Sequence, residues 1–331
     1  RAAWHFTPSL FARFRQDDLG LVSFAHLIAV LVQRNRRLQN RILLASYDRA
    51  GDGTLDADDI ETFVDDIQSQ GFLRGVRSVP KQFRGRWLQM CSQKFMFLHG
   101  RRGRVRVKDL ACSPAMQELQ ELYQDPYETG SIHANLQALS RNWFSVHSAQ
   151  RVHNMFVDLD TDMDGELTPE DLQSFAGGGL TEVFVKRLFE VHGLRLGAGK
   201  HGGMGFKAFS EFVIAWEAKA LKPCLAYFFR LFDLQGLGYL THVEVYTFFK
   251  EVAAKMAAHG MGEDLKIEDV SNEVFDMLRP AREDRITLED LTQSECGPTV
   301  VDILSDVNGF WRYDNRESLM HEEEEEEDPF G

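Results

Sequence analysis

Twelve residues, Asp160–Asp171, constrain the fold more than any other stretch of this 331-residue chain. Asp160, Asp162 and Asp164 alternate, and Gly165 follows at once. These residues match positions 1, 3, 5 and 6 of an EF-hand loop, where alternate carboxylates curl around a hard cation such as calcium. Glycine at position 6 permits a sharp turn that a Cβ would resist. The spacing therefore predicts a helix-loop-helix unit that holds a cation.

The second half of this loop supplies the remaining ligands and starts the next helix. Glu166 stands at position 7, which offers a backbone carbonyl, and Thr168 begins a capping box with proline at the first helical position. Position 12 is Asp171, although a longer glutamate usually holds the ion with both oxygens there. The short side chain predicts weak calcium binding and tolerance of magnesium. The alternative is an acidic helix cap without metal.

A second copy of the frame lies at 48–59. Asp48, Asp52 and Asp59 are its candidate ligands, but position 3 is Ala50 and lacks a carboxylate. A cage with one carboxylate fewer binds calcium more weakly. Both a metal-bound and a metal-free loop are therefore open alternatives at this position.

A third copy, at 233–244, has Leu237 at position 5, where a ligand should be, and is expected to be metal-free. Weaker echoes without a ligand set follow at four places, 15–26, 98–109, 199–210 and 279–290. A single unit buries its apolar faces poorly, so each loop should pair with a sister loop. We expect 160 to pair with 199 and 233 with 279, while the pairing of the three front units stays open.

The repeated frame predicts an all-α fold of tandem EF-hand-like units packed as an elongated array of several lobes. We expect four regions: degenerate EF-hand-like units, a pair that holds the near-intact calcium loop, a degenerate pair with a C-terminal segment that has no EF-hand frame of its own, and an acidic, disordered tail. Their boundaries are 1–140, 141–218, 219–318 and 319–331.

Composition narrows the class of protein. The net charge is −14, from 37 basic and 51 acidic residues, and seven of the acids form the run 322–328. Nucleic-acid binding is therefore not expected. The four cysteines are scattered without CxxC pairing, which favours a reducing, cytoplasmic compartment. No apolar run is long enough for a membrane span. No nucleotide-binding, metallo-hydrolase or nucleophile motif is present, so an enzyme is not expected.

A basic stretch between Arg34 and Lys108 has two interpretations. Arginines recur at 34, 36, 37 and 41 and again from 84 to 106. They are either solvated faces of helices and loops or a cationic surface that docks an acidic partner.

Several segments together resemble the B double-prime class of regulatory subunits of protein phosphatase 2A, in particular the gamma-type branch that includes the plant Tonneau/Fass proteins. The similarity runs from about Phe6 to Glu317. The segments that carry it are Tyr47-Asp-Arg-Ala-Gly-Asp-Gly, Lys108-Asp-Leu-Ala-Cys-Ser, Asn142-Trp-Phe-Ser, Glu273-Val-Phe-Asp-Met-Leu-Arg-Pro and Asp306-Val-Asn-Gly-Phe-Trp-Arg-Tyr-Asp-Asn-Arg-Glu317.

The resemblance implies a non-catalytic subunit that joins a HEAT-repeat scaffold subunit and a phosphatase catalytic subunit and directs them to phosphoprotein substrates. It also implies calcium in EF-hands, and an association with the cytoskeleton, with cortical microtubules and the division plane in plant relatives or with centrosomes in animal ones. By position the ion site is Asp160, Asp162, Asp164, Glu166 and Asp171. The resemblance also identifies the segment from Asp306 to Glu317 as the family's C-terminal closing segment. The alternative function is a free calcium sensor that binds amphipathic target helices, although sensors usually carry several intact loops.

Overall fold

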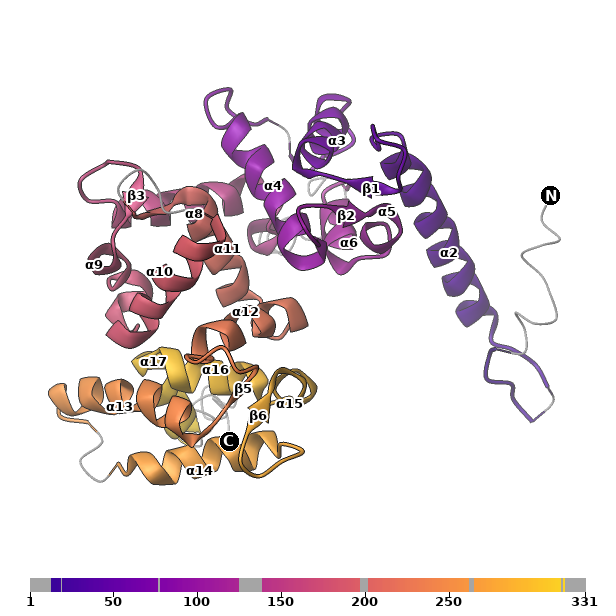
Figure 1. The fold of residues 1–331 in the computed structure, drawn as a ribbon. Coiled ribbons are helices and arrows are strands. Elements are labelled where there is room, and N and C mark those ends of the chain that lie inside the picture. The colour runs from indigo at the N-terminus through magenta and orange to yellow at the C-terminus, as the bar shows by residue number, and fades with distance from the viewer. Residues whose placement is uncertain are drawn as a thin grey trace, which may run out of the picture. The chain divides into compact units, whose positions relative to one another are not determined.

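The computed structural model describes residues 13–18, 20–76, 78–124, 139–196, 202–261, 265–316 and 318. The chain splits into two compact units, Arg1–Ala149 and Gln150–Gly331, called unit 1 and unit 2. Both consist of helices joined by two-residue strands, so the expected all-α array of EF-hand-like units is confirmed (Figure 1). The finer division at 140 and 218 stays a prediction. The acidic tail at 319–331 lies outside the described residues.

Unit 1 is built around one pair of loops. Its described elements are α2 (Phe24–Ala45), β1 (Thr54–Leu55), α3 (Ala57–Ser69), α4 (Arg84–His99), β2 (Val105–Arg106), α5 (Val107–Leu110) and α6 (Pro114–Glu121). Strands β1 and β2 are antiparallel, with Leu55 opposite Val105. The loop at 48 therefore pairs with that at 98, which settles the pairing that the sequence left open. Among the described residues, the bridge at the loop at 15 lies within that loop, from Gln16 to Val22.

Helix α3 forms because its N-terminal cap and the spacing of its apolar residues both favour a helix at these positions. Asp56 caps it with a capping box to Asp59, and Ile60 and Phe63 repeat at the spacing of one helical face. These two apolar side chains are fully buried. Helix α4 supplies the opposite wall with Trp87, which is also fully buried.

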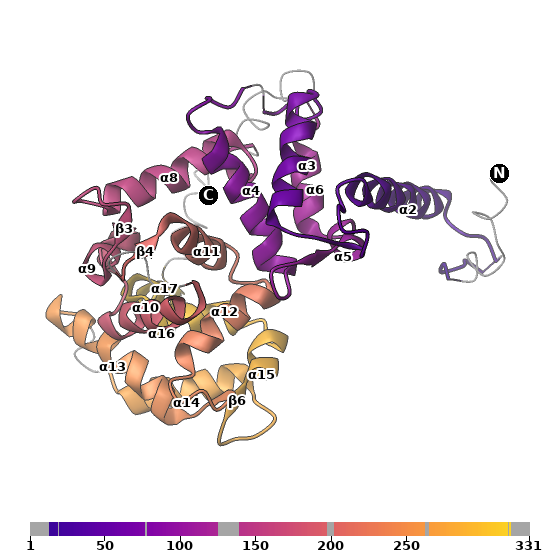
Figure 2. The same cartoon turned by 45° about the horizontal axis from the view of Figure 1, so that its top comes forward.

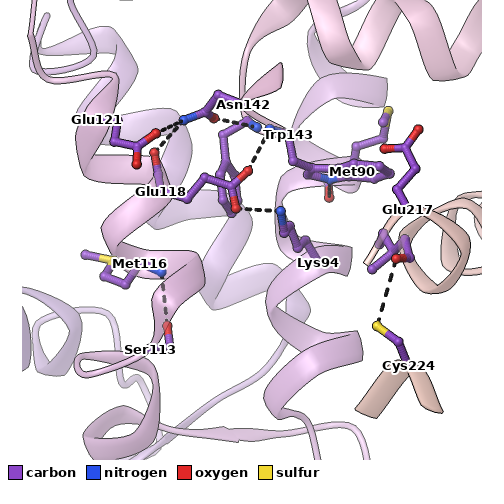
Figure 3. A network of polar contacts seen from close by, with 12 residues as sticks. Met90, Lys94, Ser113, Met116, Glu118, Glu121, Asn142, Trp143, Glu217 and Cys224 are labelled. Atoms are coloured by element: carbon purple, nitrogen blue, oxygen red, sulfur yellow. Dashed lines mark hydrogen bonds and ion pairs between the residues drawn. The ribbon is translucent and has the colours of Figure 1, made fainter. Parts of the chain in front are cut away.

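The segment Asn142-Trp-Phe-Ser closes unit 1 by hydrogen bonds rather than by a helix of its own. The Asn142 amide donates to the Glu118 carbonyl at 2.7 Å and to the Glu121 carboxylate at 3.1 Å. The Trp143 backbone N–H donates to the Glu118 carboxylate, which also pairs with Lys94 at 2.6 Å (Figure 3). The segment thus ties α6 to α4.

Unit 2 contains two further loop pairs. Its elements are α8 (Val146–Leu159), which begins in unit 1, then β3 (Glu166–Leu167), α9 (Pro169–Leu172), the 3-10 helix η2 (Phe175–Gly178), α10 (Glu182–Leu196), β4 (Met204–Gly205), α11 (Phe206–Glu217), α12 (Lys222–Phe232), β5 (Tyr239–Leu240), α13 (His242–Ala258), α14 (Ile267–Leu278), β6 (Ile286–Thr287), α15 (Leu288–Gln293), α16 (Gly297–Ser305) and α17 (Val307–Asp314). Strand β3 pairs with β4 and β5 with β6, both antiparallel, which confirms the two expected pairings.

The two loop pairs of unit 2 share an aromatic core. The ring of Phe184 on α10 lies 6.5 Å from that of Phe212 on α11 and 6.3 Å from that of Phe228 on α12. All three side chains are fully buried. Ring pairs at such distances add to the free energy gained from burial of apolar surface.

The closing segment at 306–314 lies against the exit of the Asp160 loop. Asp306 caps α17 and forms a bridge with Leu180, and the Asn308 amide donates to the Ala176 carbonyl at 3.1 Å. Gly179 passes so close that a Cβ there would lie 1.9 Å from Asp306 Oδ1. The chain after the loop and the C-terminal segment are therefore packed together.

Within the described part of the chain, no helix is both long enough and apolar enough to cross a bilayer.

Candidate metal centre

The three alternating carboxylates of the Asp160 loop come together. Ligand oxygens of Asp160, Asp162 and Asp164 lie within 4.8 Å of one another, and no other group of three or more such side chains is found among the described residues. Asp160 is 8% exposed, whereas Asp162 and Asp164 face solvent. Like charges at this distance repel, so the cluster favours a bound cation.

Backbone geometry holds these side chains in place. Helix α8 ends at Leu159 and presents Asp160 at the start of the loop. Gly165 has φ 86°, a conformation that favours glycine, and its N–H donates to Asp160 Oδ2 at 3.0 Å. The Glu166 N–H donates to Asp164 Oδ1 at 2.8 Å. The turn thus points carboxylate oxygens toward one centre.

Asp160 has one oxygen without a partner. Its Oδ1 is buried and accepts no hydrogen bond within the described structure. A buried carboxylate oxygen with no partner is costly, and a hard cation is the kind of group that would satisfy it. The donor set therefore fits a calcium-type ion, with carboxylates from Asp160, Asp162 and Asp164 as its ligands.

The other two predicted ligands have different positions. The Glu166 side chain accepts from the Gly203 N–H at 3.2 Å, so it faces the sister loop and leaves its backbone carbonyl as the donor predicted for position 7. Asp171 accepts from Thr168 N–H at 2.9 Å and from Thr168 Oγ1 at 2.7 Å. Its carboxylate belongs to the predicted capping box and lies outside the group of three.

The second predicted loop is neutralised by arginines. Arg49 Nε donates to Asp59 Oδ1 at 2.5 Å, and Arg104 from the sister loop lies 3.6 Å from Asp52. The hydrogen bond to Asp59 raises the pKa of Arg49. Hydrogen bonds from the hydroxyl and the N–H of Thr54 lower the pKa of Asp52, and the charge of Arg104 contributes less. Both oxygens of Asp48 accept backbone N–H groups, from Gly51 and Gly53. This geometry favours the metal-free alternative at 48–59.

In the third loop, an amide side chain takes the place that an ion would occupy. Gln235 Nε2 donates to Glu244 Oε1 at 2.9 Å, and the other oxygen of Glu244 accepts from Thr241. Asp233 accepts from the N–H groups of Leu237 and Gly238. The terminal carboxylate is therefore satisfied within the protein, in line with the expected loss of the ion.

Sequence patterns did not identify Arg49, Arg104 and Gln235 as the groups that occupy these loops. A signal was present, because Arg49 and Gln235 fill positions 2 and 3 and Arg104 lies in a loop rich in arginine. What the sequence cannot show is which carboxylate each long side chain reaches. Met163 at position 4 was also missed: it adopts φ 59° where the other two loops have Gly51 and Gly236.

The chain was compared with protein-family models, curated proteins and solved structures, and no family model matches. Among curated proteins, it is 39% identical over 321 residues to TON2 of Arabidopsis thaliana, a probable B''-type regulatory subunit of serine/threonine-protein phosphatase 2A, covering 96% of this chain and 65% of that protein. It is 32% identical over 318 residues to the gamma form of the B'' regulatory subunit of Xenopus tropicalis, covering 95% and 68%.

A solved chain described as part of a PP2A PR70 holoenzyme, with the label "diCa", shares the fold. Its TM-score is 0.65 at 23% identity, covering 80% of this chain and 94% of that one. The chain spans about two thirds of the length of the curated relatives, 65% of the Arabidopsis protein. Similarity of this extent shows that the chain belongs to the B'' family of protein phosphatase 2A regulatory subunits.

Proposed function

We propose that the protein is a non-catalytic B'' subunit of a phosphatase 2A holoenzyme, which binds the HEAT-repeat scaffold and the catalytic subunit and directs them to phosphoprotein substrates. The observation that carries this proposal is similarity over 96% of the chain to a relative named as a regulatory subunit. The fold shared with a chain of a PP2A PR70 holoenzyme supports it.

The test is reconstitution from purified components. The chain is mixed with the scaffold and catalytic subunits, and the mixture is separated by gel filtration. We expect one peak that contains all three proteins, with phosphatase activity toward a model phosphopeptide contributed by the catalytic subunit alone. Migration of this chain apart from both partners, at concentrations where another regulatory subunit co-migrates, would contradict the proposal.

We further propose that the Asp160 loop holds calcium. Asp160, Asp162 and Asp164 would supply carboxylates and Glu166 its backbone carbonyl. The capping bonds of Asp171 compete with the ion for that carboxylate, which predicts weak binding and tolerance of magnesium. The unpartnered Asp160 oxygen supports this proposal. The ion would supply positive charge that fixes the loop, whereas the protein itself would recognise its partners.

A free calcium sensor is less well supported. Such sensors open a helix pair when ions enter several loops. Here the terminal carboxylates of two loops are held by Arg49 and Gln235. One ion site suits a support for the fold better than a switch.

The proposed location is the cytoplasm, with association to microtubule or centrosome structures that organise cell division. The cytoskeletal part rests on the family alone. Fluorescence imaging of a tagged full-length protein in dividing cells, beside a tubulin marker, tests it. Uniform cytoplasmic signal through division would contradict the cytoskeletal part.

A further inference from the structure

The described residues leave most of the apolar surface of helix α2 uncovered. Of its 22 residues, the structure buries Leu27, Asn40 and Leu44. Phe24 is 74% exposed and Ile42 is 66% exposed. In both views the helix meets the rest of unit 1 near α5 and extends away from it (Figure 2). A monomeric protein seldom exposes so many large apolar side chains along one helix, so such a face marks an interaction site.

Residues along this face follow a regular spacing. Phe24, Ile28, Leu31, Asn35, Leu38 and Ile42 alternate at steps of four and three along α2. This spacing aligns them in one stripe, the seam by which a helix packs along a partner helix. A single asparagine within such a seam fixes register at some loss of stability, and Asn35 occupies that place. At 1.5 Å per residue the helix is about 33 Å long.

The seam leads into a groove. A cavity of about 630 Å³ lies where α2 meets the paired loops of unit 1, and Leu38 and Ile42 of the seam line it together with Val107. Continuity of the seam with the groove favours an extended helical ligand over a small molecule. One end of a partner helix would lie along the seam of α2. Apolar side chains at the other end of that partner helix would enter the groove.

Basic side chains predominate around this surface, although Arg106 of the groove pairs with Asp109. Helix α2 carries Arg34, Arg36, Arg37 and Arg41 and no acidic residue. Lys108 and Arg106 line the groove beside Arg41, while its two aspartates, Asp48 and Asp52, accept hydrogen bonds from their own loop. By helical spacing, Arg34 and Arg41 flank the seam, whereas Arg36 and Arg37 lie on the opposite side of the helix. A second copy of the chain would bring four arginines, twice two, to the seam without an acid from either helix. The acidic run at 322–328 matches the charge but has no apolar seam.

We propose that the α2 seam and its groove, which we call the α2 docking surface, bind an acidic amphipathic helix of a partner protein. Apolar side chains of that helix would pack on Phe24, Ile28, Leu38 and Ile42. Its glutamates or aspartates would lie beside the arginines. The inference uses neither the cation nor the phosphatase, and it favours the docking interpretation of the basic stretch over a solvated face.

Peptide binding to the full chain tests this proposal. The probe is a fluorescent synthetic peptide of about three heptads, with leucines at the four-three spacing and glutamates beside them. A scrambled peptide of the same composition and a lysine version serve as controls. Anisotropy should show binding of the ordered acidic peptide alone, weakened by added salt because the charges are exposed. Equal binding of the scrambled peptide would overturn the proposal.

Exposed substitutions sharpen the test without disturbing the core. Ile42→Glu and Leu38→Glu should each weaken peptide binding by about tenfold or more, the loss typical of a central interface contact. Val243→Glu changes an apolar residue on α13 that is 63% exposed and should leave binding unchanged. Circular dichroism checks that each variant is folded. Unchanged affinity of both seam variants would contradict the proposal.

Sedimentation of the wild-type chain tests whether a second copy of the chain, instead of an acidic helix, occupies the seam. The acidic-helix proposal predicts a monomer in the absence of peptide. A dimer that Ile42→Glu converts to a monomer would assign the seam to a second copy and overturn the proposal.

Discussion

The loops at 48–59 and 160–171 share one frame and balance their acidic residues in different ways. In unit 1, Arg49 and Arg104 lie against Asp59 and Asp52. In unit 2, three carboxylates lie within 4.8 Å, and one buried oxygen of Asp160 has no partner among the residues that the structure describes. Both loops still pair with a sister loop and begin the next helix with a capping box. The loop frame is therefore kept in unit 1, where arginine side chains supply the positive charge. Ion binding is thus separate from the fold of the loop.

The largest expected effect comes from removing the open carboxylates. Asp160→Ala with Asp164→Ala should abolish calcium-dependent stabilisation, which for the wild type reaches about 2.7 kcal/mol when free ion is at a hundred times its dissociation constant. Thermal melts in calcium and in chelator measure it. The matched control is Asp48→Ala with Asp52→Ala in unit 1, which should keep the full calcium response. A double variant at 160 and 164 that still gained stability from calcium would contradict the comparison.

A second change would convert the closed loop into an open one. Arg49→Gln releases Asp59, and Ala50→Asp restores the carboxylate at position 3. In chelator we expect the double variant to melt about 2–4 °C below wild type, because Asp59 is only 2% exposed and loses its partner. Calcium should recover the difference. Arg49→Gln alone is the control: it should be destabilised and unresponsive. A double variant with wild-type melting and no calcium response would show that Arg49 does not hold this loop.

The third prediction concerns pH and the closing segment of unit 2. Burial raises the pKa of Asp306, although the Asn308 N–H, Arg312 and Lys219 oppose the rise and Asp302 adds to it. A folded-state pKa above the unfolded value stabilises the fold at low pH, and this contribution is lost as pH rises through the folded value. Asp306→Asn keeps an oxygen for the helix cap and removes the charge.

The melting temperature of Asp306→Asn, relative to wild type, should therefore rise by about 2 °C between pH 4 and pH 7. Melts across that range measure it. A difference that stays constant with pH would show that the Asp306 carboxyl titrates alike in the folded and unfolded chain.

The smallest expected effect is at position 4 of the two loops. Met163 is 84% exposed at φ 59°, and a left-handed non-glycine residue costs about 1–2 kcal/mol. Glycine relieves this strain but adds about 0.5–1 kcal/mol of backbone entropy in the unfolded chain. Met163→Gly should thus stabilise unit 2 by about 0.5 kcal/mol, and Gly51→Met should destabilise unit 1 by a similar amount in denaturant unfolding. Destabilisation by Met163→Gly together with stabilisation by Gly51→Met would contradict the shared loop conformation.

Much of the fold could be predicted because the loop frame is local in sequence. The roles of Gly165, Leu167 and Thr168 depend on neighbours within a few residues of each. Spacing alone therefore predicts the turn, the β-pair and the helix cap. The pairings of 160 with 199 and of 233 with 279 followed from adjacency. The pairing of 48 with 98 did not, because three front units offered more than one arrangement.

The groups that occupy the loops could not be predicted, because they depend on long side chains and distant segments. Arg104 reaches Asp52 from a separate loop, and Asn142 and Asp306 fix segments far along the chain. The family resemblance already implies that the segment beginning at Asp306 closes the fold. The role of Asn142-Trp-Phe-Ser, which ties α6 to α4, becomes visible only when the helices are packed.

Hydrogen exchange on the whole chain, with and without calcium, tests the central comparison most directly. Calcium should slow exchange of backbone amides in Glu166–Leu167 and Met204–Gly205, because an ion at Asp160 fixes the loop and its sister strand. Amides in Thr54–Leu55 and Val105–Arg106 should exchange at the same rate in both conditions, since Arg49 and Arg104 already close that loop. Protection by calcium in unit 1, or in neither unit, would contradict the account.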